Sequence, residues 1–196
     1  PVRFIGNYSS GKMGLAIAEE LAGRGAEVVL VCGPVNLKTH HPAIRRVDVE
    51  SAAQMYEVTS REFANSDVAV LSAAVADFTP KEKADHKIKR GKDDLVLELL
   101  PTKDIAAELG KMKNASQLLV GFALETNDEE VNALSKMQRK NLDMIVLNSL
   151  NDKGAGFGVD TNKVTIMDKA GNRTVYELKT KLEVAKDIVD QIASRL

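Results

Sequence analysis

The stretch Asp67-Val68-Ala69-Val70-Leu71-Ser72-Ala73-Ala74-Val75-Ala76-Asp77-Phe78 decides the fold. Its apolar part, Asp67–Ala74, predicts a strand buried in a parallel sheet. Glu27–Cys32 predicts a second strand of the kind that is buried in a parallel sheet covered on both faces, and Leu118–Ala123 predicts a third strand. Helical patterns such as Lys12–Arg24 alternate with these strands. Repeated βα units predict an α/β fold. We expect a doubly wound, mostly parallel, Rossmann-like sheet with helices on both faces.

The remaining elements continue this alternation. Further strands are expected at Ile44–Val49, Leu95–Leu100 and Asp143–Leu147. A further helix is expected to begin after the N-cap Ser51 and to end near Asn65. The other helices are expected at Thr102–Lys113, Asp128–Lys140 and Lys181–Leu196. The C-terminal part departs from the pattern. Lys163–Met167 and Thr174–Leu178 flank the turn residues Ala170-Gly171-Asn172 and predict a β-hairpin.

Composition limits the class of protein. A chain of 196 residues with 44% hydrophobic residues can form one domain with a sizeable core. The net charge of −1 gives no sign of nucleic acid as a partner. No apolar run approaches the roughly 18 residues that a membrane-spanning helix needs. Cys32 is the single cysteine, which suits a reducing compartment, so we expect a cytoplasmic protein that contacts neither membrane nor nucleic acid.

The segment Gly6–Gly14 almost matches a P-loop. Lys12 follows Gly11 as the pattern demands, but Met13 stands where a hydroxyl should hold Mg²⁺, and a thioether is a poor ligand for a hard cation. Polar residues and the N–H groups that open the next helix still favour an anion site here. The alternative is that Ser10 is only a helix N-cap.

Polar or glycine-rich residues follow each predicted strand, where ligands bind in such sheets. They are Gly33-Pro34, Ala76-Asp77-Phe78, Pro101-Thr102-Lys103-Asp104, Glu125-Thr126 and Asn148. Small residues before Asp77 would let a flat ligand approach the backbone, and Asp77 suits a ribose hydroxyl or a metal-bound phosphate, unless it only caps a helix. Lys87–Arg90 suits a lid over a triphosphate, although a charged loop is more often solvated surface, as are Lys136 and Lys140.

Five blocks of the sequence together resemble the phosphopantothenate–cysteine ligase family. They are Asn7–Gly14, Ala73–Phe78, Lys87–Arg90, Gly121–Thr126 and Lys140–Asp143, in family order over essentially the whole chain. The resemblance implies a ligase that joins 4′-phosphopantothenate to cysteine through an acyl cytidylate. CTP is consumed, Mg²⁺ is required, and CMP and pyrophosphate are released. It also implies a homodimer, with the Lys163–Leu178 hairpin as a plausible exchanged arm.

The same resemblance implies the site residues. Lys87 matches a lid lysine that acts on the triphosphate in the first step, and Asn7 matches an asparagine that contacts the acyl group and supports the second step. Asp77 matches an acid near ribose, phosphates and metal. The other nucleotide contacts are Ser9, Leu71, Ser72, Ala73, Phe78, Lys103, Asp104, Ile105, Ala106, Phe122, Lys136 and Lys140, and the other substrate contacts are Arg3 and Ala74. The backbone around Leu71–Ala73 would read the cytosine.

One domain over residues 1–196 with a mobile lid at about 79–94 is expected. Family sequences begin with an apolar strand and a Gly-Gly-Thr turn ahead of the position of Pro1, and this sequence does not contain them. Two alternatives stay open. An NAD(P)-binding reductase would need an acid after the Glu27–Cys32 strand, where Gly33-Pro34 stands instead. The other is a non-catalytic nucleotide-binding domain on the same fold.

Overall fold

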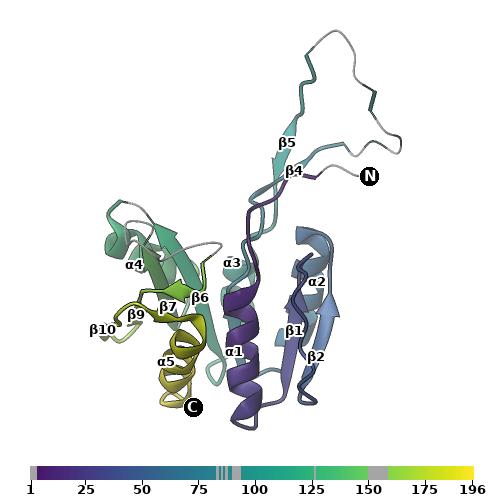
Figure 1. Cartoon of the computed structure of the whole chain (residues 1–196). Coiled ribbons are helices and arrows are strands. Elements are labelled where there is room, and N and C mark those ends of the chain that lie inside the picture. Colours follow the sequence, from purple (N-terminus) through teal and green to yellow (C-terminus); the bar gives the residue numbers. More distant parts are fainter. Residues whose placement is uncertain are drawn as a thin grey trace.

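The computed structural model contains a five-stranded sheet, which lies on one side of α1 (Lys12–Gly23) in Figure 1, opposite the pair of strands β1 (Val28–Cys32) and β2 (Ile44–Asp48). The structure describes residues 4–82, 84, 86, 88–89, 94–125, 127–149 and 159–196. The strand order is β10-β9-β7-β6-β3. These strands are β3 (Val68–Leu71), β6 (Leu118–Glu125), β7 (Met144–Ser149), β9 (Val164–Asp168) and β10 (Arg173–Val175). Strands β3, β6 and β7 are parallel, and β9 and β10 form the predicted hairpin, with β9 antiparallel to β7.

Helices cover both faces of this sheet because successive side chains of a strand point to opposite faces. Val146 of β7 packs in a cluster with α1 (Lys12–Gly23) and α5 (Lys181–Ala193). Its neighbour Ile145 packs in a second cluster, to which the remaining three helices contribute. Those helices are α2 (Ala52–Phe63), α3 (Ile105–Met112) and α4 (Glu129–Arg139). The chain is therefore a mixed α/β protein, as the sequence predicts.

Strands β1 (Val28–Cys32) and β2 (Ile44–Asp48) form a separate two-stranded parallel sheet. The sequence predicts that β1 and β3 are buried, and this prediction is wrong in degree, because every residue of both strands is only half-buried. In the described ranges no strand pairs between β1 and β3, so each of them leaves one edge open.

An arm projects from the end of the body at which α1 begins (Figure 1). It contains β4 (Phe78–Pro80) and β5 (Leu99–Pro101), which pair antiparallel with Thr79 opposite Leu100. The predicted strand over Leu95–Leu100 is therefore wrong in extent, because only its last two residues belong to β5, and Glu98 before them accepts a single backbone bond from Lys81 N–H. The sequence does not predict strand β4, since Pro80 is tolerated only at a sheet edge or strand end.

The helix starts follow local sequence rules. Ser51 caps α2, as predicted, in a capping box with Gln54. Two short strands, β8 (Thr161–Asn162) and β11 (Lys179–Thr180), pair just before α5, and Thr180 caps α5 in a second capping box. Within the ranges that the structure describes, none of the helices has the length and apolar content that a bilayer crossing requires.

Candidate functional site

The loop between β3 and β4 is held through three consecutive carbonyl groups. Asn7 Nδ2 donates a hydrogen bond to the Val75 carbonyl at 3.0 Å. Thr102 Oγ1 donates to the Ala76 carbonyl at 2.7 Å, and Thr102 N–H donates to the Asp77 carbonyl at 2.8 Å. The structure thus brings the predicted residue Asn7 to the predicted loop at the carboxyl end of β3.

Helix α1 begins beside the same loop. Its N-cap is Gly11, in the left-handed region with φ of 74° and without a side-chain cap, so the alternative in which Ser10 is the N-cap is wrong. A Cβ on Gly14 would lie 2.8 Å from Ser72 Oγ, which shows how closely the helix approaches the loop. Lys12 forms an ion pair with Asp160. The glycines of the near-P-loop therefore permit close packing.

A second group of predicted residues gathers where α3 and α4 meet β6. Lys140 Nζ lies 2.8 Å from the Asp104 carboxylate, and Lys136 Nζ donates to the Phe122 carbonyl at 2.9 Å. Both lysines are half-buried, so the default interpretation of them as solvated surface is wrong. Two basic side chains and the Phe122 backbone thus come together at one side of the sheet.

Asp104 joins this group to the start of α3. Its carboxylate accepts a hydrogen bond from Ala107 N–H at 3.1 Å and so caps the helix. Partial burial acts to raise the pKa of Asp104, but the Lys140 ammonium and the Ala107 N–H outweigh burial and hold that pKa below its usual value. Asp104 therefore stays ionised beside Lys140. The predicted contacts Ile105 and Ala106 form the first turn of this helix.

Gly110 determines how closely α3 approaches the end of α4. A Cβ on Gly110 would collide with the Lys140 carbonyl oxygen. Asn141, with φ of 52°, donates a hydrogen bond from Nδ2 to the Gly110 carbonyl at 2.7 Å. Asn tolerates this left-handed conformation better than most residues. The contact fixes the position of Lys140, the C-cap residue of α4.

Lys103 makes a contact of a different kind. Its Nζ lies 4.3 Å from the centre of the Tyr56 ring on α2, a cation–π interaction worth about 0.5–1 kcal/mol at an exposed site. The sequence does not single out Tyr56, because a lone tyrosine in a helical pattern carries no signal of such a role. The contact ties the residue before Asp104 to α2.

Asp77 is the only predicted metal ligand, and its side chain is exposed. In the part of the chain that the structure describes, no cation or donor lies within bonding distance of its carboxylate, and no three His, Cys, Asp or Glu side chains gather in a way that could hold a metal ion. Mg²⁺ is often bound by one or two carboxylates together with substrate phosphates. A single available carboxylate fits a magnesium ion that arrives with a nucleotide.

The remaining predicted residues are placed as follows. Leu71 ends β3, while Ser72, Ala73 and Ala74 begin the loop after it. Phe78 starts β4 and is 52% exposed, and Ser9 Oγ accepts a hydrogen bond from Gly11 N–H at 3.4 Å. Arg3 and Lys87 lie outside the described residues. Thr102 belongs to a polar segment that follows a predicted strand, but no motif predicts a role for it.

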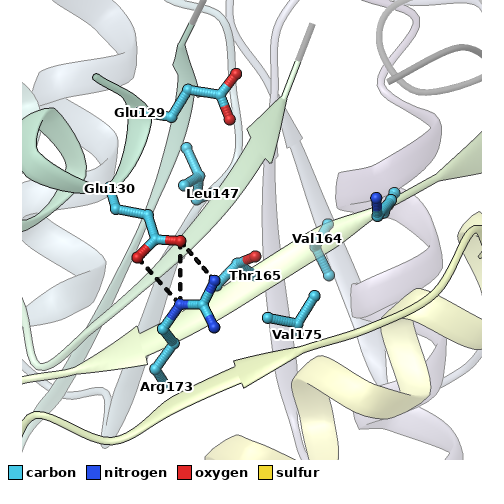
Figure 2. Close-up of a pocket in the computed structure, with 8 residues that line it drawn as sticks. Glu129, Glu130, Leu147, Val164, Thr165, Arg173 and Val175 are labelled. Carbon is cyan, nitrogen blue, oxygen red and sulfur yellow. Dashed lines mark hydrogen bonds and ion pairs between the residues drawn. The ribbon is translucent and has the colours of Figure 1, made fainter. Parts of the chain in front are cut away.

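Two cavities lie away from the predicted residues. One, of about 180 Å³, lies between the start of α4 and the β9–β10 hairpin, where Arg173 forms a two-point ion pair with Glu130 (Figure 2). The other, of about 240 Å³, lies beside Asp168 and Lys169. Neither cavity is lined by a residue that the sequence assigns to the site.

Comparison with known proteins decides the family. The model of the DNA/pantothenate metabolism flavoprotein C-terminal domain matches residues 1–196. The chain belongs to this family. The resemblance that the five sequence blocks indicate is thereby confirmed.

Two curated relatives of this chain differ in name, and both are longer than it. It is 61% identical over 192 residues to a cysteine/cysteine sulfinic acid decarboxylase from an unknown prokaryotic organism, covering 98% of this chain and 54% of that protein. It is 46% identical over 194 residues to the coenzyme A biosynthesis bifunctional protein CoaBC of Bacillus subtilis, covering 99% of this chain and 48% of that protein. The chain thus spans about half the length of the curated relatives it matches.

A solved structure shares the fold. The crystal structure of the C-terminal domain of a coenzyme A biosynthesis bifunctional protein CoaBC matches with a TM-score of 0.82 and 43% identity. The match covers 98% of this chain and 86% of that one. The arrangement of β3, β6 and β7 with helices on both faces therefore belongs to a known family architecture.

Proposed function

We propose that this chain is a phosphopantothenate–cysteine ligase domain that acts in coenzyme A biosynthesis. In the first step a carboxylate oxygen of 4′-phosphopantothenate attacks the α-phosphorus of CTP, pyrophosphate leaves, and an acyl cytidylate forms. In the second step the cysteine amine attacks the acyl carbon, an amide forms, and CMP leaves as the amine loses a proton. Positioning and charge stabilisation are the main demands of such chemistry.

The observation that carries the proposal is the convergence on the loop Ser72–Asp77. Asn7 donates a hydrogen bond to the Val75 carbonyl of this loop. Asp77, at the end of the loop, has no ion-pair partner among the described residues. Asn7 would contact the acyl group in the second step. Asp77 would lie near ribose and phosphates and hold Mg²⁺ brought by the nucleotide, and that ion would offset phosphate charge.

Further cations would complete the nucleotide site. Lys136 and Lys140 would contact the nucleotide together with Phe122, and the segment Lys103–Ala106 lies beside them. Lys87 would act on the triphosphate from a lid at about residues 79–94, and Arg3 and Ala74 would contact phosphopantothenate. Backbone groups around Ser72 would read the base, and CTP is proposed on the family resemblance.

Two other activities receive less support. A nicotinamide-dependent reductase would need an acid at the end of β1, where Cys32 is followed by Gly33 and Pro34. A non-catalytic nucleotide-binding domain would have no need to retain Asn7, Asp77 and Lys87 together. The lone cysteine and the ligase chemistry together suit the cytoplasm.

We further propose one doubly wound, Rossmann-like domain over residues 1–196. Strands β1 and β3 each leave an edge open among the described residues, and each belongs to a parallel pair. A parallel strand between them would give the order β2-β1-strand-β3-β6-β7-β9-β10. The apolar strand with which family sequences begin would fill this place.

A homodimer is proposed as well, with the arm as its contact. Apolar side chains lie exposed on the arm and on the segment before α1, among them Phe4 at 90%, Tyr8 at 92% and Val96 at 87% exposure. Exposed apolar side chains in such numbers mark interaction surfaces. The Lys163–Leu178 hairpin is the weaker candidate, because β9 pairs with β7 of the same chain.

The test is pyrophosphate release from 4′-phosphopantothenate, Mg²⁺ and either CTP or ATP, measured with and without cysteine. Release that requires phosphopantothenate and is faster with CTP would support both the ligase and its nucleotide. Formation of the amide product only when cysteine is present would support the second step. Carbon dioxide release from cysteine without nucleotide would instead indicate the activity named for the 61% identical relative.

A further inference from the structure

In the second half of the loop Ser72–Asp77 the backbone carbonyls are occupied, while backbone N–H groups of the loop stay available as donors. Its Val75, Ala76 and Asp77 carbonyls all accept hydrogen bonds from elsewhere in the chain. Among the described residues, no acceptor lies within bonding distance of the backbone N–H groups of Ala73, Ala74, Val75 and Ala76. A loop in this state suits ligand atoms that accept hydrogen bonds, such as base carbonyl and ring nitrogen atoms or phosphate oxygens.

Two of the three bonds to these carbonyls come from a single residue, Thr102. It directly follows β5, where Pro101 is paired with Phe78 at the base of the arm. Its hydroxyl and its N–H reach Ala76 and Asp77 at 2.7 and 2.8 Å. Thr102 is β-branched, so its χ1 angle has few alternatives, and it is half-buried.

We propose that Thr102 is a positioning residue for nucleotide binding. It touches neither substrate nor metal in this role. Its hydroxyl holds the Ala76 carbonyl away from the ligand, so that the N–H groups of the loop face the nucleotide and the Asp77 carboxylate stays in place. This inference rests on the proposed ligase function for the identity of the nucleotide, but the anchoring of the loop does not depend on it.

The position of Thr102 also links the nucleotide loop to the arm. The residue lies between the end of β5 and the Asp104 cap that begins α3. A shift of the arm would therefore pass to Ala76 and Asp77 through one hydrogen bond each.

The test compares Thr102→Val, which keeps the shape and loses the hydroxyl, with Thr102→Ser, which keeps the hydroxyl. For a lost hydrogen bond we expect Thr102→Val to raise the KM for CTP about five- to tenfold with kcat changed less than about twofold. Thr102→Ser should stay within about twofold of the unchanged protein in both constants. Thr39→Val is the matched control, because the Thr39 hydroxyl only accepts a local bond from His41 N–H.

A second readout does not require activity. Backbone ¹⁵N order parameters of Ala73, Ala74 and Ala76 should fall in Thr102→Val and recover in Thr102→Ser. Unchanged KM and unchanged order parameters in Thr102→Val would overturn the positioning role. So would an equal loss of kcat in both Thr102 variants. If the unchanged protein releases no pyrophosphate, the ligase proposal fails, and the order parameters alone then decide the role of Thr102.

Discussion

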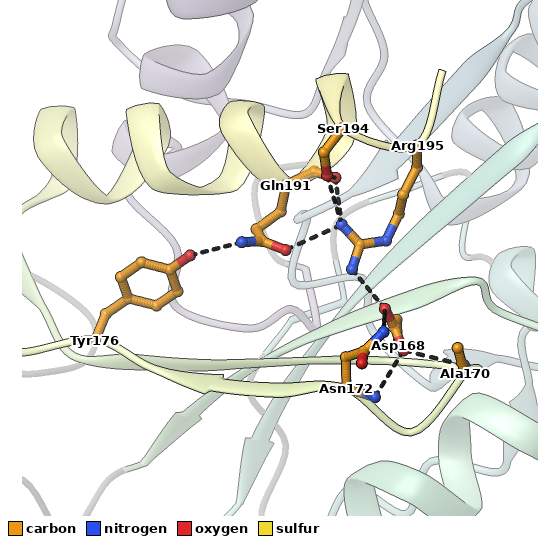
Figure 3. Close-up of polar contacts among 7 residues, drawn as sticks. All are labelled: Asp168, Ala170, Asn172, Tyr176, Gln191, Ser194 and Arg195. Atoms are coloured by element: carbon orange, nitrogen blue, oxygen red, sulfur yellow. Dashed lines mark hydrogen bonds and ion pairs between the residues drawn. The ribbon is translucent and has the colours of Figure 1, made fainter.

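Arg195 Nη2 lies 2.5 Å from Asp168 Oδ2 and ties the chain after α5 to the turn between β9 and β10 (Figure 3). The Asp168 carboxylate also accepts hydrogen bonds from the N–H groups of Ala170 and Asn172 and from Asn172 Nδ2. Arg195 in turn contacts the side chain of Gln191. One buried carboxylate thus closes the hairpin turn and fixes the last helix against it.

The first prediction concerns the pH dependence of stability. Burial acts to raise the pKa of Asp168, but Asn172 and Arg195 outweigh burial and lower that pKa from 3.8 to about 2. Because the folded pKa lies below the unfolded one, the charged carboxylate stabilises the fold above about pH 4, and this contribution is lost as the pH falls towards 2. Asp168→Asn should lower the free energy of unfolding by about 2 kcal/mol at neutral pH.

Urea unfolding of Asp168→Asn and the unchanged protein at several pH values checks this. The difference in the free energy of unfolding should shrink between about pH 4 and pH 2, because over this range the Asp168 carboxylate takes up a proton more readily in the unfolded chain than in the native protein. A difference that stays constant over this range would show that shape, not charge, sets the contribution of Asp168.

The second prediction concerns the buried charge of Asp143, which is 3% exposed. Lys113 Nζ lies 2.6 Å from its carboxylate, Lys169 pairs with it from the surface, and Leu119 N–H donates to it at 2.8 Å. Asp143→Ala strands the buried Lys113 ammonium and should cost about 3–5 kcal/mol of unfolding free energy. Lys113→Met should cost less, since Asp143 keeps two partners.

Chemical unfolding of the double variant Lys113→Met/Asp143→Ala distinguishes charge from packing. It should be more stable than Asp143→Ala alone, because no unpaired ammonium remains in the core. Strictly additive losses would argue that the two side chains do not interact energetically.

The third prediction uses the close approach of α1 to the loop after β3. Gly14→Ala places a Cβ 2.8 Å from Ser72 Oγ and should raise the KM for the nucleotide by pushing the loop away. Stability should hold or rise, because Ala is better in a helix than Gly by up to about 1 kcal/mol. Steady-state kinetics and thermal unfolding measure the two effects. Adding Ser72→Ala should restore the KM, and a double variant as impaired as Gly14→Ala would locate the strain elsewhere.

The fourth prediction separates the two chemical steps at Asn7. Asn7→Asp should leave acyl-cytidylate formation largely intact but slow amide formation by on the order of 100-fold, the effect of losing a donor at a developing charge. Rapid-quench measurement of pyrophosphate and of the amide product resolves the steps. Aspartate cannot donate to the Val75 carbonyl, so a modest rise in the KM for CTP should accompany the change. Equal slowing of both steps would remove this division of labour.

The fifth prediction concerns Lys87, which lies outside the described residues. Lys87→Gln should slow pyrophosphate release by on the order of 100-fold, because a cation aimed at the triphosphate is lost. Lys186→Gln on the exposed face of α5 is the matched control and should behave like the unchanged protein. Near-normal release by Lys87→Gln would exclude that lysine from the first step.

Local sequence signals predicted most of the elements but not all of their pairing. The Ser51 cap, the β9–β10 hairpin and the βα alternation are confirmed, because each depends on residues close together in the sequence. The half-buried state of β1 depends on which strand lies beside it, and no local pattern reports that. The Leu95–Glu98 run looks like part of a strand, yet only the residues after it meet β4.

For the candidate site too, the sequence predicts some of the residues and not others. Motif blocks identified Asn7, Asp77 and Lys140 from residue type and order, and the structure places Asn7 and Lys140 in specific contacts. Thr102 and Tyr56 act through contacts with residues far away in the sequence, so single-sequence patterns could not assign them. The sequence also could not show that Lys136 of α4 and Lys140 at its C-cap are half-buried, since helical spacing alone also fits a solvated face.

The absence of a side chain at Gly110 sets the distance between α3 and the end of α4. Any larger residue there would meet the Lys140 carbonyl and spread α3 from α4, moving a cation without changing a charge. Asn141 would lose its bond to the Gly110 carbonyl in the same movement. Under the proposed role of Lys140, a substitution at Gly110 would change nucleotide affinity through the spacing of two helices, at a position that carries no charged group of its own.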